Sequence, residues 1–130
     1  MKKALRLILG DQLNSNHSWF KSVDDSVTYV MMEVRTETDY TQHHIQKVVG
    51  IFAAMRNFAL QLKSNNHNLI YFHLNDENNL QSFQDNIQNL ISEHEFNHFE
   101  YQLPDEYRVD QDLIELCNTI SIPSKSVDSE

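Results

Sequence analysis

Two polar stretches of the chain carry the residue types of a ligand site. Gly10, Asp11 and Gln12 follow the first apolar run of the sequence, and residues 33–40 follow the second. Glycine lets a backbone turn tightly and approach a ligand closely. Carboxylates accept hydrogen bonds from a heterocyclic N–H or from sugar-like hydroxyls. The carboxylates that suit this role are Asp11, Glu33 and Glu37.

The same residues also fit a purely structural role. Asp11 and Asp39 can cap helices, and Glu37 can point into solvent. Further along, His43 and Lys47 share one face of an expected helix because they lie four residues apart. The two side chains either line the mouth of the same ligand crevice as Glu37 and Tyr40 or form a solvent-facing pair, and the sequence leaves both alternatives open.

Several kinds of site are excluded or disfavoured by composition. His43 and His44 are neighbours on a helix and point about 100° apart, so they cannot converge on one metal ion. The single cysteine, Cys117, excludes an internal disulfide and is too few for an iron–sulfur cluster or a Cys-rich zinc site. With Gly10 and Gly50 as the only glycines, the chain has neither the G-x-G-x-x-G motif of dinucleotide-binding proteins nor a Walker phosphate-binding loop. A phosphate-free heterocycle therefore fits better than a nucleotide.

The charge of the chain bears on its partners. A formal net charge of −9 repels a polyanion, because affinity for nucleic acid comes largely from Lys and Arg replacing condensed counterions. No apolar run approaches the roughly 20 residues that span a bilayer. The basic pair at residues 2–3 precedes only a short apolar segment, residues 5–10, with no small-residue cleavage site of a signal peptide. We expect a cytoplasmic domain that binds neither a membrane nor, by itself, DNA.

The spacing of apolar residues predicts alternating strands and helices. Short apolar runs predict strands, whereas apolar residues at i, i+3, i+4 and i+7 predict helices. Between the first two strands, a long crossover carries Trp19 and Phe20, which suit a short helical or irregular segment. The predicted strands cover residues 5–10, 27–33, 69–74, 96–103 and 120–127, and the predicted helices cover residues 41–63, 80–91 and 109–117.

This order of elements predicts an α/β fold with an open parallel sheet covered by helices on both faces. Ligands of such sheets bind outside the carboxyl ends of the strands where the strand order reverses. Because the reversal must fall beside Gly10 for a crevice to open there, we predict that the first strand is central and the order is 3-2-1-4-5. Pro123 places the last strand at an edge.

Two long segments resemble the opening of the deoxyribodipyrimidine photolyase-related proteins, the bacterial cryptochromes and (6-4) photolyases that carry an iron–sulfur cluster. The segments read LRLILGDQLNSNHSWF and YVMMEVRTETDYTQHHIQKVVGIFAAMRNFA, and the later LPDEYRVD is similar to the family's segment that enters the third helix. The family often has TEPGEWR where this chain has QLPDEYR, so Tyr107 replaces a tryptophan and a glycine is absent.

The resemblance implies a Rossmann-like sheet of five parallel strands that holds an antenna chromophore, 6,7-dimethyl-8-ribityllumazine. It also implies that FAD and a 4Fe-4S cluster belong to a later helical domain. On the matching positions, Asp11, Glu33, Glu37 and Tyr40 surround the lumazine and Met32 touches its ring. The full set of expected ligand contacts is Gly10, Asp11, Gln12, Met32, Glu33, Glu37, Tyr40 and His43.

Residues 1–130 are therefore interpreted as a single antenna-binding domain, a fragment that lacks the helical flavin domain. It performs no catalysis alone, and the longer protein acts in light-dependent repair of pyrimidine lesions or in blue-light sensing. The partners are the helical domain and, through the longer protein, damaged DNA. The alternative is a chromophore-free docking domain of the same fold. A third alternative, a free-standing nucleotide-binding protein, is less well supported because the phosphate-binding glycines are missing.

Overall fold

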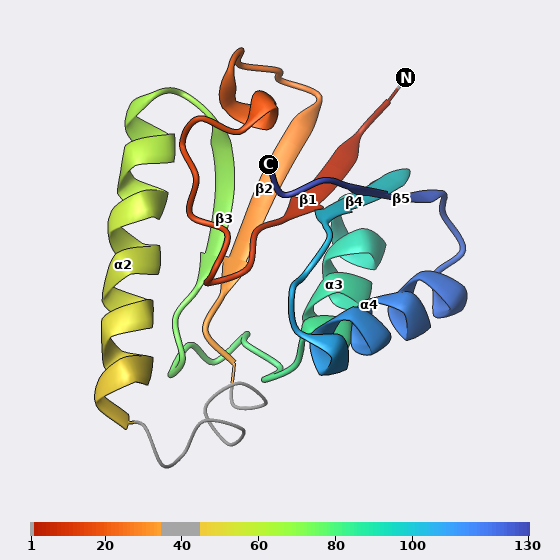
Figure 1. Cartoon of the computed structure of the whole chain (residues 1–130). Helices are drawn as coiled ribbons and strands as arrows, with labels where there is room; N and C mark the ends of the chain where they lie inside the picture. The colour runs from red at the N-terminus through yellow and green to blue at the C-terminus, as the bar shows by residue number, and fades with distance from the viewer. Residues whose placement is uncertain (1, 35–44) are drawn as a thin grey trace.

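The computed structural model describes residues 2–34 and 45–130, which form one five-stranded sheet with helices on both faces (Figure 1). The strands are β1 (Ala4–Leu7), β2 (Val27–Met32), β3 (Asn68–Phe72), β4 (His98–Gln102) and β5 (Ser124–Val127). The helices are the short 3-10 helix η1 (Ser18–Phe20), α2 (Ile45–Ser64), α3 (Phe83–His94) and α4 (Tyr107–Thr119).

The sheet is parallel throughout, and its order is β3-β2-β1-β4-β5. The predicted fold class and strand order are therefore confirmed, with β1 central and β5 at an edge. Because β2 and β4 flank β1 on opposite sides, the strand order reverses between β1 and β4. This switch point is where open α/β sheets leave a crevice at the carboxyl ends of their strands.

Two apolar cores lie on the two faces of the sheet. Successive strand residues point to opposite faces, so Leu5 and Leu7 pack toward α3 and α4, whereas Ala4 and Ile8 pack toward α2. The nearly continuous apolar runs of the sequence are explained by this double covering. Cys117 of α4 packs partly buried against the first core, as its place in the apolar stripe predicted.

The crossover between β1 and β2 packs on the α2 side of the sheet. It contains η1, in which Trp19 is buried. The carbonyl oxygen of Trp19 accepts a hydrogen bond from Tyr29 Oη at 2.9 Å. His17 Nδ1 accepts from Trp19 N at 3.1 Å, and its Nε2 lies 2.8 Å from the carbonyl oxygen of Asp128. The crossover therefore ties the end of the chain to the sheet, and Figure 1 shows the C-terminus beside it.

The helix expected over residues 80–91 begins later than its apolar stripe suggested. Gln81 has a left-handed φ of 69°, and the Ser82 side chain accepts from Asp85 N and caps α3. Leu80 therefore precedes the helix and is 48% exposed.

Within the described ranges, no helix is long and apolar enough to cross a membrane.

Candidate ligand site at the carboxyl ends of the strands

A hollow of about 280 Å³ opens at the switch point, beyond the carboxyl ends of β1 and β4. Its position is the one that open α/β sheets use for ligands. We call it the switch-point crevice. It is lined by Asp11, Gln12, Leu13, Asn14, Leu103, Asp105, Ser129 and Glu130.

Gln12 shapes this crevice by joining the ends of the two strands. Its side chain is buried, and its Oε1 accepts a hydrogen bond from Leu9 N at 3.2 Å. Its Nε2 donates to the carbonyl oxygens of Gln102 at 3.2 Å and Leu103 at 3.4 Å. Since both amide protons of Gln12 are used within the protein, its contribution to a ligand site is mainly to hold the walls in place.

Asp11 contributes negative charge to the crevice. Asp11 is exposed, but partial burial of its carboxyl raises its pKa, and the charges of Asp105 and Glu106 raise it further. Carboxylates accept hydrogen bonds from hydroxyl and N–H groups, whereas they repel phosphate. The lining therefore favours a ligand with hydroxyl or N–H groups over a phosphorylated one.

Gln102 is a buried polar residue that sequence reasoning missed, and it lies behind the crevice rather than among its lining residues. It ends β4 directly before Leu103 and is fully buried, and neither its Nε2 nor its Oε1 has a hydrogen-bond partner among the described residues. Leaving such a buried group unpaired costs about 1–3 kcal/mol. The signal in the sequence was a glutamine closing an otherwise buried strand.

The packing of α2 explains why position 10 holds a residue without a side chain. A Cβ atom at this position would lie 2.9 Å from Ile51 Cγ2 and 3.1 Å from Met55 Sδ, both on α2. Real Cβ atoms do not approach other atoms as closely as 2.9 Å. The missing side chain therefore lets α2 pack closely over the end of β1.

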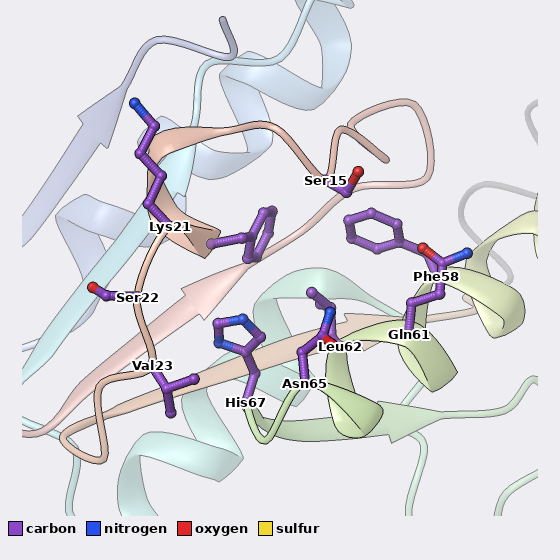
Figure 2. A pocket seen from close by; sticks show the side chains of 10 residues that line it. Ser15, Lys21, Ser22, Val23, Phe58, Gln61, Leu62, Asn65 and His67 are labelled. Carbon is purple, nitrogen blue, oxygen red and sulfur yellow. The ribbon is translucent and has the colours of Figure 1, made fainter.

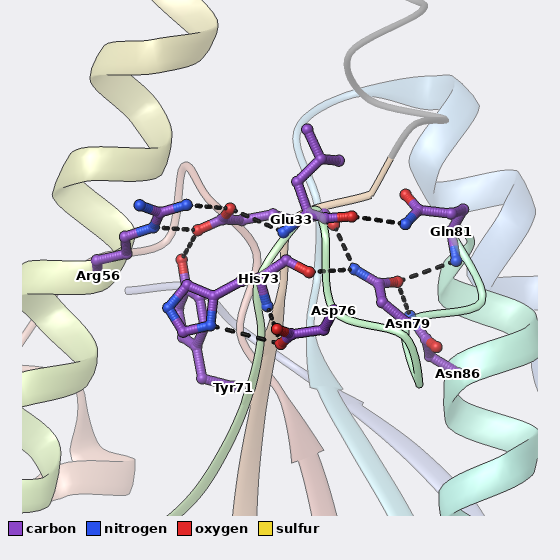
Figure 3. Close-up of polar contacts among 9 residues, drawn as sticks. Glu33, Arg56, Tyr71, His73, Asp76, Asn79, Gln81 and Asn86 are labelled. Carbon is purple, nitrogen blue, oxygen red and sulfur yellow. Dashed lines mark hydrogen bonds and ion pairs between the residues drawn. The ribbon is translucent and has the colours of Figure 1, made fainter.

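Glu33 forms the centre of a polar cluster at the end of β2 (Figure 3). Its fully buried carboxylate accepts two hydrogen bonds from Arg56, one from Nε and one from Nη2, both at 2.7 Å. It also accepts from Tyr71 Oη and, at 3.1 Å, from Leu74 N. The cluster therefore links β2 to α2 and to the segment that follows β3, and these donors occupy both carboxylate oxygens.

The pKa values within this cluster follow from its contacts. Burial would raise the pKa of Glu33, but the hydrogen bonds from Arg56 and Tyr71 outweigh it and hold the pKa below its usual range. The hydrogen bond to Glu33 raises the pKa of Arg56, and burial together with the Glu33 charge raises that of Tyr71. At neutral pH the cluster thus holds a carboxylate, a guanidinium and a neutral phenol.

Comparison with known proteins decides the family. The model of the family described as deoxyribodipyrimidine photo-lyase-related protein matches residues 6–130. The chain belongs to this family. A (6-4) photolyase of Agrobacterium fabrum (strain C58 / ATCC 33970) is 37% identical over 90 residues. That stretch covers 68% of this chain and 18% of the photolyase, so the chain spans only a small part of the length of that curated relative.

In this photolyase-related chain, the predicted ligand residues lie in different surroundings. Asp11 and Gln12 line the switch-point crevice together. Glu33 faces the α2 layer, whereas Met32 lies in the opposite core, where its Sδ is 3.4 Å from Asn86 Nδ2. The structure therefore brings Asp11 and Gln12 into one hollow and places Met32 and Glu33 on opposite faces of the sheet.

The remaining predicted contacts stay predictions. Glu37, Tyr40 and His43 lie outside the described residues, as do Asp39 and His44. The side chain of Lys47 is likewise not described. Among the residues that the structure does describe, no group of three His, Cys, Asp or Glu side chains is placed to hold a metal ion.

Proposed function

We propose that this photolyase-related domain binds 6,7-dimethyl-8-ribityllumazine in the switch-point crevice. The single observation that carries the proposal is the crevice itself, which opens beside β1 in a chain of the photolyase-related family. The bound lumazine would absorb blue light and pass the excitation to a flavin held elsewhere in a longer protein. The domain would then act as the antenna module of a photolyase- or cryptochrome-like protein.

The chemistry of the crevice supports such a ligand. The ribityl chain of a lumazine offers hydroxyl groups to the Asp11 carboxylate, and its ring offers carbonyls and an N–H. The acidic lining also suits a ligand without phosphate. Glu37, Tyr40 and His43, which lie outside the described residues, remain expected contacts.

The longer protein would act on DNA through other parts. Family membership supports a photolyase- or cryptochrome-like role, in light-dependent repair of pyrimidine lesions or in blue-light sensing. FAD and a 4Fe-4S cluster would lie in a helical partner domain. Since this chain carries a net charge of −9, contacts to damaged DNA would come from that partner domain.

Titration with the lumazine tests the proposal. We expect a saturable shift or quenching of lumazine fluorescence, because the chromophore would leave water for the crevice. Asp11→Asn should weaken binding about tenfold, and Glu37→Ala about ten- to hundredfold, because each leaves ligand donors without a carboxylate acceptor. Asp25→Asn, which changes an exposed carboxylate near the amino end of β2, is the matched control and should bind as the unmodified chain does.

Two outcomes would contradict the antenna proposal. No spectral change at high lumazine concentration would favour the chromophore-free docking domain. Equal weakening by Asp11→Asn and Asp25→Asn would show that net charge, rather than the crevice, governs the binding.

A further inference from the structure

A second hollow lies on the α2 side of the sheet, near the amino ends of β2 and β3. It encloses about 240 Å³ between the crossover that follows β1 and the last turns of α2 (Figure 2). It shares no lining residue with the switch-point crevice. We call it the amino-end pocket, and it is lined by Ser15, Phe20, Lys21, Ser22, Val23, Phe58, Gln61, Leu62, Asn65 and His67.

His67 is the unusual residue of this pocket. It is only 7% exposed, and Figure 2 shows its ring directed into the hollow. The ring makes edge-on contacts with Phe20 and Tyr29, at centroid distances of 5.8 and 5.6 Å. No described residue forms a hydrogen bond with its nitrogens, and neither nitrogen is among the buried polar atoms that are cut off from solvent. The nitrogens are therefore available to a molecule in the hollow, as one donor and one acceptor.

The imidazole of His67 is neutral at neutral pH. Burial lowers its pKa, because a low-dielectric surrounding disfavours the charged ring. A neutral imidazole presents one N–H donor and one lone-pair acceptor. The side-chain amides of Gln61 and Asn65, which also line the pocket, offer the same pair of functions.

The electrostatics of the pocket favour a neutral ligand. Lys21 is the one charged lining residue, and Figure 2 shows its side chain extending away from the His67 ring. The pocket also adjoins the C-terminal end of α2, where the helix dipole places partial negative charge and disfavours an anion. An anionic ligand would meet that end of the helix.

The apolar walls favour a flat ligand. Phe20 and Phe58 meet edge to face at 5.7 Å, and Leu62 packs in the same core layer. Aromatic rings bind other flat rings by offset or edge-to-face contacts, and small-molecule sites typically combine such walls with a few polar groups. The lining of this pocket has that composition.

We propose that the amino-end pocket binds a small, neutral, planar ring that carries an amide edge, with an N–H group beside a carbonyl. The amide edge pairs with His67, assisted by Gln61 or Asn65, and the ring packs against Phe20 and Phe58. This site is distinct from the lumazine site, because the two hollows share no lining residue and the crossover after β1 separates them.

Benzamide is a suitable probe, and its binding can be followed by the backbone amide signals of the chain in NMR spectra. We expect saturable shifts confined to residues 15–23 and 58–67. N,N-dimethylbenzamide, which has no N–H, should bind at least about fivefold more weakly. Benzoate, of the same shape but charged, should also bind more weakly, and tighter binding of benzoate would overturn the proposal of a neutral ligand.

Variants of the chain test the role of His67. His67→Phe retains an aromatic ring and removes the two nitrogens, so benzamide affinity should fall about tenfold. His94→Phe changes an exposed histidine on α3 and is the matched control. If His67→Phe does not fold, the exposed Gln61→Ala provides the second variant, with an expected loss of severalfold.

Saturating lumazine should leave benzamide binding unchanged, which separates this pocket from the switch-point crevice. The absence of saturable shifts would overturn the proposal. Unchanged affinity in a folded His67→Phe variant would overturn it as well.

Discussion

Two clusters of one arginine, one glutamate and one tyrosine lie on the same face of the sheet, but they differ in which partner reaches water. The end cluster, at the end of β2, consists of Arg56, Glu33 and Tyr71. In it, Glu33 is fully buried and the Arg56 side chain is 52% exposed. The central cluster consists of Arg6, Glu100 and Tyr29. There the Arg6 side chain is 17% exposed and that of Glu100 is 9% exposed.

The surroundings of the two arginines explain this difference. Arg6 lies across the rings of Trp19 and Tyr29, at 4.9 and 5.8 Å from their centroids, and its Nε donates to Glu100 at 2.7 Å. Arg56 projects from α2 toward the end of the sheet (Figure 3). An arginine that loses its carboxylate can rehydrate only where its side chain reaches water. The two clusters should therefore respond differently when one member is removed.

The largest effect is expected for Glu100→Ala. It leaves the enclosed Arg6 charge without its main carboxylate partner, and breaking a buried pair in this way costs about 3–5 kcal/mol. Urea unfolding measures the loss. Lys2 also pairs with Glu100, at 3.2 Å, but its side chain is 48% exposed, so Lys2→Ala should cost less than about 1 kcal/mol. Similar losses for the two variants would show that Arg6 reaches solvent after all.

A smaller effect is expected for Arg56→Ala. The variant removes two charge-assisted hydrogen bonds, but Tyr71 Oη and Leu74 N continue to donate to the Glu33 carboxylate. Because the Arg56 side chain is 52% exposed, water can also take the place of its guanidinium beside Glu33. We expect a loss of about 1–3 kcal/mol in the free energy of unfolding. Asn57→Ala, at the next and exposed position of α2, is the matched control and should change stability little. A loss as large as that of Glu100→Ala would remove the distinction between the clusters.

The smallest difference is expected in the acid dependence of stability. The pKa values of Glu33 and Glu100 are lowered from an ordinary value of 4.5, since hydrogen bonds from arginine outweigh the effect of burial. Each group therefore stabilises the fold above about pH 4.5, and this contribution is lost as the pH falls through the lower folded-state pKa.

Urea unfolding at several values between about pH 3 and pH 7 measures this dependence. Arg56→Ala should show a shallower acid loss than the unmodified chain, because Glu33 then has a less depressed pKa. Parallel curves for the two proteins would show that Arg56 does not set the pKa of Glu33.

The sequence predicted the elements because they depend on local patterns, and it predicted the switch point because a general rule links switch points to crevices. Apolar runs and helical spacing are visible along the chain, and the reversal beside Gly10 followed from the rule that places crevices at switch points. Boundaries were less accurate. The predicted last strand covered residues 120–127, whereas β5 is Ser124–Val127, because only those residues pair with β4.

By itself, the sequence determined an α/β domain of the photolyase-related family with Asp11 and Gln12 at the switch point. The tertiary structure decided which side chains meet. Arg56 reaches Glu33 because α2 packs over the end of β2, Gln102 is left unpaired because its strand is buried, and His67 faces a pocket because the crossover folds back toward α2. These partners are distant along the chain, and no local pattern encodes them, because packing between elements sets the distances between their side chains.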